Sequence, residues 1–241
     1  MAVVVVSGRR VLVIDTATDA IVTGLVTVRA GGVDEVSSRT VVDHRRHAEM
    51  LTTLMRECLT ESGWRGVDVD AVVVGCGPGP FTGLRVGMAT AAAYGDALGI
   101  PVYGVGTLDA IAAAAARGSQ ARSILVVTDA RRREVYWARY ADGRRVGGPG
   151  VSAPAVLQAE LAAEPVDLIA GGAPPHWAGG TEPASRNPGR PVVDVAPDVV
   201  GLASVIAPAL LAGSPPDPLV PLYLRRPDAV ELADQKKKRG S

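Results

Sequence analysis

The 241-residue chain carries 25 Lys and Arg residues against 25 Asp and Glu residues, so its formal net charge at pH 7 is zero. This balance gives no global field toward nucleic acid or an anionic membrane, and any RNA contact must be local or made by a partner. Aromatic residues make up 4% of the chain, which excludes an extended stacking platform for single-stranded RNA. No apolar run reaches the about 18 residues of a membrane span, and no segment near the start reads as a signal peptide. We therefore expect a cytoplasmic protein without membrane contact.

The hydrophobic pattern predicts alternating strands and helices. The expected strands are 11–16, 21–28, 36–42, 70–75, 102–105, 124–128, 134–140, 166–170 and 191–195. The expected helices are 49–61, 84–98, 108–116, 154–163 and 198–211. The order of elements in the first half recurs more loosely in the second half. This repeat predicts two similar α/β lobes with a cleft between them.

The most informative segment is the glycine-rich stretch 75–87, with the sequence GCGPGPFTGLRVG. It lies between an expected strand and an expected helix, where backbone N–H groups at the helix N-terminus can bind an anion. A tight strand-to-helix connection, stiffened by Pro78 and Pro80, explains the same composition. The segment is neither a Walker loop nor a dinucleotide fingerprint, because it lacks the Lys-Ser/Thr pair and its glycines alternate. Both the phosphate site and the simple connection stay open at this point.

Five segments, in chain order, together resemble the TsaB (YeaZ) family of threonylcarbamoyladenosine biosynthesis subunits. They are VIDTAT at 13–18, HAEML at 47–51, GPGPFTGLRVG at 77–87, DARRREVY at 129–136 and PLYLR at 221–225. The resemblance covers residues 11–225. Pro80 departs from it, because the family more often has a serine there.

The resemblance implies an α/β fold of the actin-like ATPase (ribonuclease H-like) type with two tandem duplicated lobes. It divides the chain into an N-terminal extension (1–10), an N-terminal lobe with partner-binding helices (11–117), a C-terminal lobe (118–225) and a basic, disordered tail (226–241). It also implies a non-catalytic scaffold that forms a homodimer when alone. Its expected partners are a TsaD-like catalytic subunit and a TsaE-like ATPase, and tRNA is reached mainly through that complex. The complex modifies the adenosine beside the anticodon of tRNAs that read codons beginning with A.

ATP-using relatives of this fold hold phosphate with two glycine-bearing hairpins. The matching segments here, 15–20 and 129–134, contain no glycine, and side chains block the close backbone approach that phosphate needs. We therefore expect ATP on a partner subunit rather than on this chain. The residues that would form a vestigial nucleotide or phosphate site are Asp15, Thr16, Gly79, Thr82, Gly83 and Asp129.

The resemblance places the metal ion on the catalytic partner. His44 and His47 are close enough in sequence to share a helical face, but two arginines separate them and no third ligand is evident. Cys58 and Cys76 have neither a CxxC spacing nor a histidine partner, so we expect buried reduced thiols and no catalytic residue. The alternative functions are an ATP-dependent small-molecule kinase and a peptidase-like enzyme of the same fold.

Two helices carry the expected partner surface. Gly83, Gly87, Ala91 and Gly95 recur at intervals of four, and an interior glycine costs about 1 kcal/mol relative to alanine, which close approach of another helix can offset. That helix can be internal or a partner's; the resemblance implies a dimer face. The interface residues predicted from it are Met50, Leu51, Leu54, Met55, Cys58, Leu84, Gly87, Met88, Ala91, Tyr94 and Gly95. A charged residue at Met55 or Ala91 is expected to abolish pairing and leave the monomer folded.

The basic run 131–133 has two interpretations. It is a solvated hairpin turn, or it is a local contact with tRNA.

Overall fold

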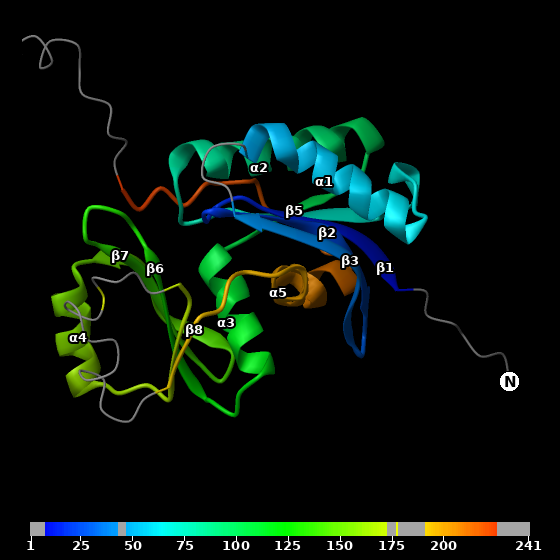
Figure 1. The fold of residues 1–241 in the computed structure, drawn as a ribbon. Helices are drawn as coiled ribbons and strands as arrows, with labels where there is room; N and C mark the ends of the chain where they lie inside the picture. Colours follow the sequence, from blue (N-terminus) through cyan, green and yellow to red (C-terminus); the bar gives the residue numbers. More distant parts are fainter. Residues whose placement is uncertain (1–7, 43–46, 173–176, 178–190, 226–241) are drawn as a thin grey trace, which may run out of the picture.

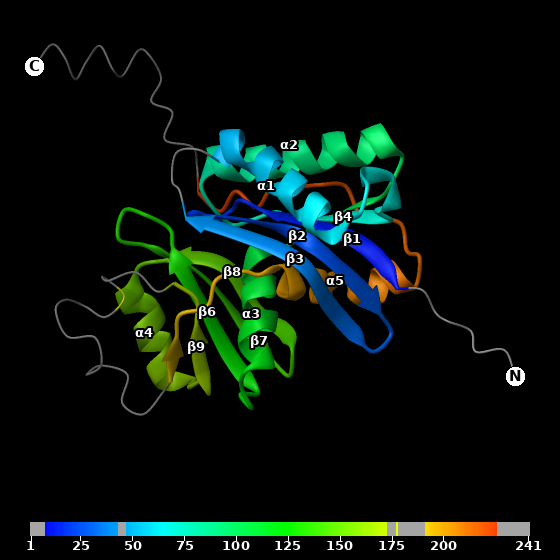
Figure 2. The same ribbon diagram turned by 45° about the vertical axis from the view of Figure 1, so that its right-hand side comes forward.

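The computed structural model describes residues 8–42, 47–172, 177 and 191–225, excluding the side chain of His47. Two five-stranded sheets and their helices form five alternating layers (Figures 1 and 2). Helices α1 (His47–Ser62) and α2 (Phe81–Leu98) cover the first sheet, α3 (Thr107–Arg117) and α5 (Val199–Leu211) lie between the sheets, and α4 (Pro154–Ala163) covers the second sheet.

The first sheet has the strand order β3-β2-β1-β4-β5. Its strands are β1 (Arg9–Asp15), β2 (Ala20–Arg29), β3 (Gly32–Val42), β4 (Ala71–Gly75) and β5 (Val102–Val105). The first three strands are antiparallel, whereas β1, β4 and β5 are parallel. The apolar run of β4 is buried along its whole length because helices cover both faces of the sheet.

The second sheet has the order β10-β9-β6-β7-β8 and repeats the antiparallel-plus-parallel plan. Its strands are β6 (Ser123–Asp129), β7 (Val135–Ala141), β8 (Arg144–Ser152), β9 (Leu168–Ala170) and β10 (Val192–Val193). Leu157 and Leu161 of α4 pack on its outer face. The predicted pair of duplicated α/β lobes is confirmed by this arrangement.

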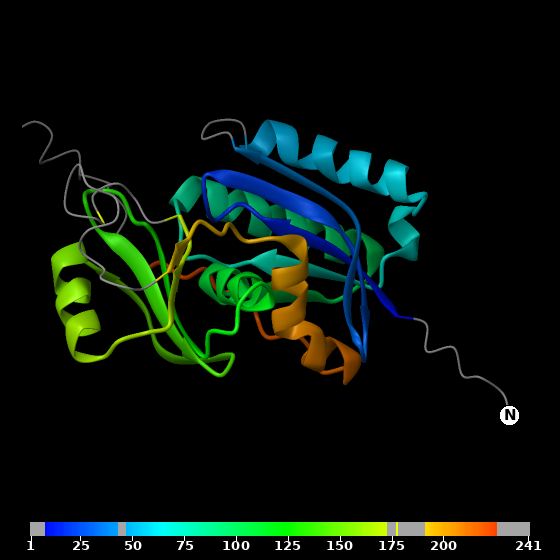
Figure 3. The same ribbon diagram turned by 60° about the horizontal axis from the view of Figure 1, so that its bottom comes forward.

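Helices α3 and α5 lie side by side between the sheets (Figure 3). A Cβ on Gly201 would lie 2.6 Å from the carbonyl oxygen of Ala110, so only glycine allows the two helices to approach this closely. Asp198 caps α5, because its side chain accepts a hydrogen bond of 2.6 Å from the N–H of Gly201.

The structure corrects three details of the predicted organisation. Arg9 and Arg10 pair with β2, so the first strand begins inside the expected extension of residues 1–10. Helix α5 packs on the first sheet, although it lies within the expected C-terminal lobe of residues 118–225. The order of elements along the chain does not tell which sheet a later helix covers. Strand β8 was not predicted, since three glycines and Pro149 hide its alternation. Residues 226–241 lie outside the described residues.

Replacing Gly201 by Ala is expected to lower the free energy of unfolding by about 1–3 kcal/mol, because the added methyl group forces α3 and α5 apart. Gly118→Ala is the matched control: nothing lies within 4 Å of its added Cβ, and its effect should stay within about 0.5 kcal/mol. Chemical denaturation of both variants measures the difference. Equal stability of the two variants would contradict the close α3–α5 contact.

Candidate functional site

The glycine-rich segment connects β4 to α2, and its first residues form backbone hydrogen bonds with other parts of the chain. Cys76 donates its N–H to Val105 at 2.7 Å, and its carbonyl accepts the N–H of Leu222 at 2.8 Å. The carbonyl of Gly77 accepts the N–H of Thr107 at 2.7 Å. Pro78 and Pro80 have no N–H to offer. They interrupt the run of consecutive backbone donors that would cradle a phosphate.

The glycines of this region let it press against the end of β1. An added Cβ at Gly79 would overlap the backbone of Ala17, and one at Gly75 would overlap the carboxylate of Asp15. An added Cβ at Gly87, in the second turn of α2, would overlap the hydroxyl of Thr16. Protein atoms thus fill the space beside the first hairpin. This geometry favours the connecting role of the segment over a phosphate site.

Asp15 is fully buried at the end of β1. One of its carboxylate oxygens accepts the N–H of Ala17 at 2.8 Å, and the other accepts the hydroxyl of Thr107 at 2.7 Å. Burial raises the pKa of Asp15 to about 6, although both hydrogen bonds act in the opposite direction. The neighbouring Thr16 donates to the carbonyl of Gly83 at 2.7 Å. Together, these two side chains fasten β1 to α3 and α2.

The predicted vestigial site is only partly brought together. Asp15, Thr16, Gly79 and Gly83 surround the end of β1. Thr82 is exposed on the first turn of α2. Asp129, at the end of β6, is also exposed, and its carboxylate accepts the N–H of Arg131 in its own turn at 2.8 Å. A match to a family motif therefore does not tell which of the matched side chains lie close together in the folded chain.

Within the part of the chain that the structure describes, no group of three or more His, Cys, Asp or Glu side chains is placed to hold a metal ion. His44, His176 and the side chain of His47 lie outside the described residues. Cys58 and Cys76 are buried free thiols, as predicted. Burial raises the pKa of Cys76 to about 11, which disfavours a thiolate nucleophile. Among the described residues, no helix has the length and apolar character to cross a membrane.

Most of the predicted interface residues lie on the inner face of the helix pair. Met55 is 4% exposed and Ala91 is fully buried, and an added Cβ at Gly95 would overlap Val102 of β5. Leu51, Leu54, Cys58, Leu84, Gly87 and Met88 are buried in the same way. Only Met50 and Tyr94 of the predicted set are partly exposed. The glycine stripe therefore packs on the chain's own sheet.

The expected effect of a charge at Met55 or Ala91 is corrected by this burial. An unpaired charge at either position would be placed in the core under the first sheet, and it would unfold the monomer rather than disrupt pairing alone. Helical periodicity finds the apolar face of a helix but does not tell whether that face meets the sheet or a partner.

The outer face of the helix pair is formed by other residues. On α2 the exposed positions include small side chains, which are Ala89, Ala92, Ala93 and Ala97. Small side chains leave a low surface on which a second helix can pack closely. Because α1 and α2 lie side by side on the sheet, they present this face together (Figures 1 and 2).

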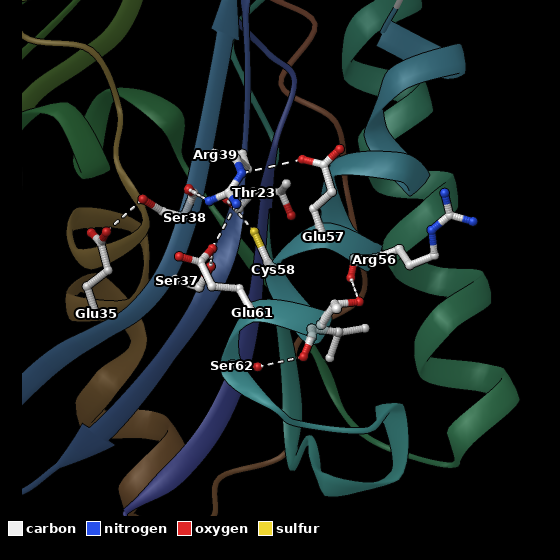
Figure 4. Close-up of polar contacts among 12 residues, drawn as sticks. Thr23, Glu35, Ser37, Ser38, Arg39, Arg56, Glu57, Cys58, Glu61 and Ser62 are labelled. Atoms are coloured by element: carbon white, nitrogen blue, oxygen red, sulfur yellow. Dashed lines mark hydrogen bonds and ion pairs between the residues drawn. The ribbon is translucent and has the colours of Figure 1, made fainter.

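Polar contacts join the C-terminal half of α1 to β3 (Figure 4). Arg39 of β3 forms ion pairs with Glu57 at 3.4 Å and with Glu61 at 2.8 Å. Ser37 donates to the same Glu61 at 2.8 Å, and these contacts lower the pKa of Glu61, with the Ser37 hydrogen bond as the largest cause. Cys58 lies on the buried side of these contacts, against the carbonyl of Thr23.

Residues 219–225, which we call the strap, join the two lobes after α5. Tyr223 stacks on Phe81 with ring centroids 5.2 Å apart and accepts a hydrogen bond of 2.8 Å from Arg85. At the other end, Arg225 donates to the carbonyl of Ala130 at 2.6 Å and pairs with Glu134 at 2.9 Å. The strap, orange-red in Figure 1, thus runs from the start of α2 to the β6–β7 turn.

The β6–β7 turn has an unusual backbone. Arg131, Arg132 and Arg133 have φ angles of 61°, 52° and 62°, and all three residues are exposed. Left-handed conformation costs a residue with a side chain about 1–2 kcal/mol, so contacts around the turn must hold it. The two carboxylates of the turn serve its own structure and the strap, through Asp129 and Glu134.

Comparisons with known proteins show which sequences and structures this chain is similar to. A family model described as TsaD, tRNA N6-adenosine threonylcarbamoyltransferase, matches residues 39–170. An uncharacterized protein of Mycobacterium tuberculosis is 51% identical over 223 residues, which are 92% of this chain and 95% of that protein. The tRNA threonylcarbamoyladenosine biosynthesis protein TsaB of Escherichia coli is 35% identical over 164 residues, 67% of this chain and 68% of that protein.

The chain belongs to the TsaB (YeaZ) family. A solved structure of YeaZ from Pseudomonas aeruginosa is 30% identical and superposes with a TM-score of 0.70, covering 90% of this chain and 100% of that one. The family resemblance and the actin-like ATPase fold with two lobes are both confirmed. Within this TsaB-family chain, the strap is the element whose role sequence reasoning missed. The PLYLR motif at 221–225 marked this segment as part of the family pattern. The residues around it in the sequence do not indicate that the segment joins the two lobes.

The stability of the fold is expected to fall as the pH rises through the pKa of Asp15. Because the folded pKa of about 6 exceeds the ordinary value of 3.8 for an aspartic acid, folding favours the neutral acid. Its contribution, on the order of 3 kcal/mol, is complete below pH 3.8 and is lost as the pH passes 6. Asp15→Asn keeps the group neutral at every pH and should remove this loss between pH 4 and pH 7.

Denaturant unfolding at several pH values measures this effect. Asp129→Asn, which removes an exposed carboxylate, is the control and should keep the pH dependence of the unchanged chain. Parallel stability curves for Asp15→Asn and the unchanged chain would contradict the assignment.

Proposed function

We propose that this chain is a non-catalytic, activating subunit of the cytoplasmic complex that forms threonylcarbamoyladenosine in tRNA. Family membership brings the biosynthetic role, since the E. coli relative is named for it. The observation that carries the non-catalytic part is the filled end of β1, where Gly75 and Gly79 press against Asp15 and Ala17. A chain that occupies its own nucleotide position with backbone and a buried carboxyl group is suited to support a partner's chemistry.

The partner proposed for the helix pair is a TsaD-like catalytic subunit. The match of residues 39–170 to the TsaD family model supports this choice, because two homologous chains can pack through equivalent surfaces about a pseudo-twofold axis. The alanine-rich outer face of α2 is where such a helix would fit. Without that subunit, a second copy of this chain would occupy the same face as a homodimer.

The chemistry is then assigned to the other components. The TsaD-like subunit would hold the metal ion and transfer threonylcarbamoyl to the adenosine next to the anticodon, in tRNAs that read codons beginning with A. A TsaE-like ATPase would use the ATP. Micromolar, magnesium-dependent ATP binding by this chain alone would instead favour a small-molecule kinase.

Ala93→Arg on the outer face of α2 is expected to weaken assembly with the TsaD-like subunit at least tenfold, because the long charged side chain prevents close helix packing. Ala159→Arg is the matched control, since Ala159 is an exposed alanine on α4 of the other lobe. Size-exclusion chromatography with light scattering measures assembly, and circular dichroism checks that both variants fold. Assembly of Ala93→Arg at the strength of the control would contradict the proposed face.

Product formation gives a second test of the same proposal. A reconstituted mixture of the TsaD-like subunit, the TsaE-like ATPase and tRNA should form threonylcarbamoyladenosine only when this chain is added. The Ala93→Arg variant should lower the yield in proportion to its weaker assembly. Mass spectrometry of the digested tRNA measures the product, and full yield without this chain would overturn the proposed role.

A further inference from the structure

The β6–β7 turn is a cluster of positive charge on a chain whose formal net charge is zero. Arg131, Arg132 and Arg133 are exposed there, whereas the whole sequence balances 25 basic with 25 acidic residues. Arg225 lies directly beneath the turn, bonded to the carbonyl of Ala130. A local cluster of positive charge on a protein without net charge attracts an anionic ligand only at short range, and it therefore defines where that ligand binds.

The two acidic side chains of the turn contact its backbone and the strap. Asp129 accepts the backbone N–H of Arg131 at 2.8 Å, and Glu134 pairs with Arg225 of the strap at 2.9 Å. Both carboxylates are therefore used to build the turn. The guanidinium of Arg85, on the first turns of α2, adds a further charge at the opposite end of the strap.

The shape of the turn is imposed on these arginines rather than preferred by them. All three have left-handed φ angles, which asparagine or glycine would adopt at lower cost. The strap holds this conformation: Arg225 binds the carbonyl of Ala130, and Leu224 packs in the core of the second lobe. Sparsely populated backbone conformations that the surroundings impose are found preferentially at functional sites.

We propose that the turn Arg131–Arg133, supported by Arg225 and the strap, binds the phosphodiester backbone of tRNA. The planar guanidinium group matches the oxygen geometry of phosphate, and contacts with phosphate position an RNA without reading its sequence. The inference rests on the proposed function, because that function brings a tRNA to the complex. It extends it by giving this subunit a direct contact with the substrate.

A triple variant tests the turn: Arg131→Asn, Arg132→Asn and Arg133→Asn. Asparagine tolerates the left-handed conformation, so the turn keeps its shape while three positive charges are removed. The matched control removes three arginines from the far end of the same sheet, through Arg122→Asn, Arg144→Asn and Arg145→Asn. Both variants therefore change the net charge equally.

The probe is a fluorescently labelled, unmodified tRNA transcript that reads a codon beginning with A. Its affinity is measured over a range of salt concentrations for this chain alone and for its assembly with the TsaD-like subunit. The turn variant should bind at least about tenfold more weakly, and its salt dependence should fall by about two to three released ions. The control should bind within about twofold of the unchanged chain.

Three results would overturn the proposal for the turn. The first is tRNA binding by the turn variant with unchanged affinity and salt dependence, and the second is no tRNA binding by the unchanged chain, alone or in the assembly. The third is loss of assembly with a protein partner while tRNA affinity stays unchanged, which would assign the arginines to an acidic protein surface. Assembly is scored separately on the same samples, so a failure of the proposed function is distinguished from a failure of the turn.

Discussion

The close approach of the glycine-rich segment to the end of β1 is the constraint on which the rest of the structure depends. Gly75 and Gly79 have no side chain where Asp15 and Ala17 come against them, and this contact sets the direction in which α2 leaves the sheet. Thr107 reaches the same carboxylate from the start of α3. Asp15 therefore joins β1 to α3, and the neighbouring Thr16 joins β1 to α2. Burial of the Asp15 carboxyl group favours its neutral form.

The two faces of the helix pair differ in what their small residues contact. Gly87 and Gly95 lie against Thr16 and Val102 of the sheet, so the glycines serve the interior of the lobe. The alanines at 89 and 93 are left on the outside, where they form a low surface. Because the inner face is packed tightly and Arg39 ties α1 to β3 through Glu57 and Glu61, the outer face is presented as a rigid unit.

The strap gives the two lobes a connection independent of the central helices. It is bound to the glycine-rich segment through Cys76 and to the β6–β7 turn through Arg225. The strap thus links the glycine-rich segment, which packs against the end of β1, to the exposed and basic β6–β7 turn.

Except for β8, the order of elements could be predicted from the sequence, as could the two-lobed fold class and the family, because hydrophobic periodicity and the spacing of motifs are local properties of a single chain. The sequence also identified the glycine-rich segment and both buried cysteines. The folded structure was needed to show that the stripe through Gly87 and Ala91 faces the sheet, that α5 covers the first sheet, and that the strap supports the arginine turn. These outcomes depend on which surfaces meet across distances of many residues, and a periodic pattern tells that a face is buried without telling what covers it.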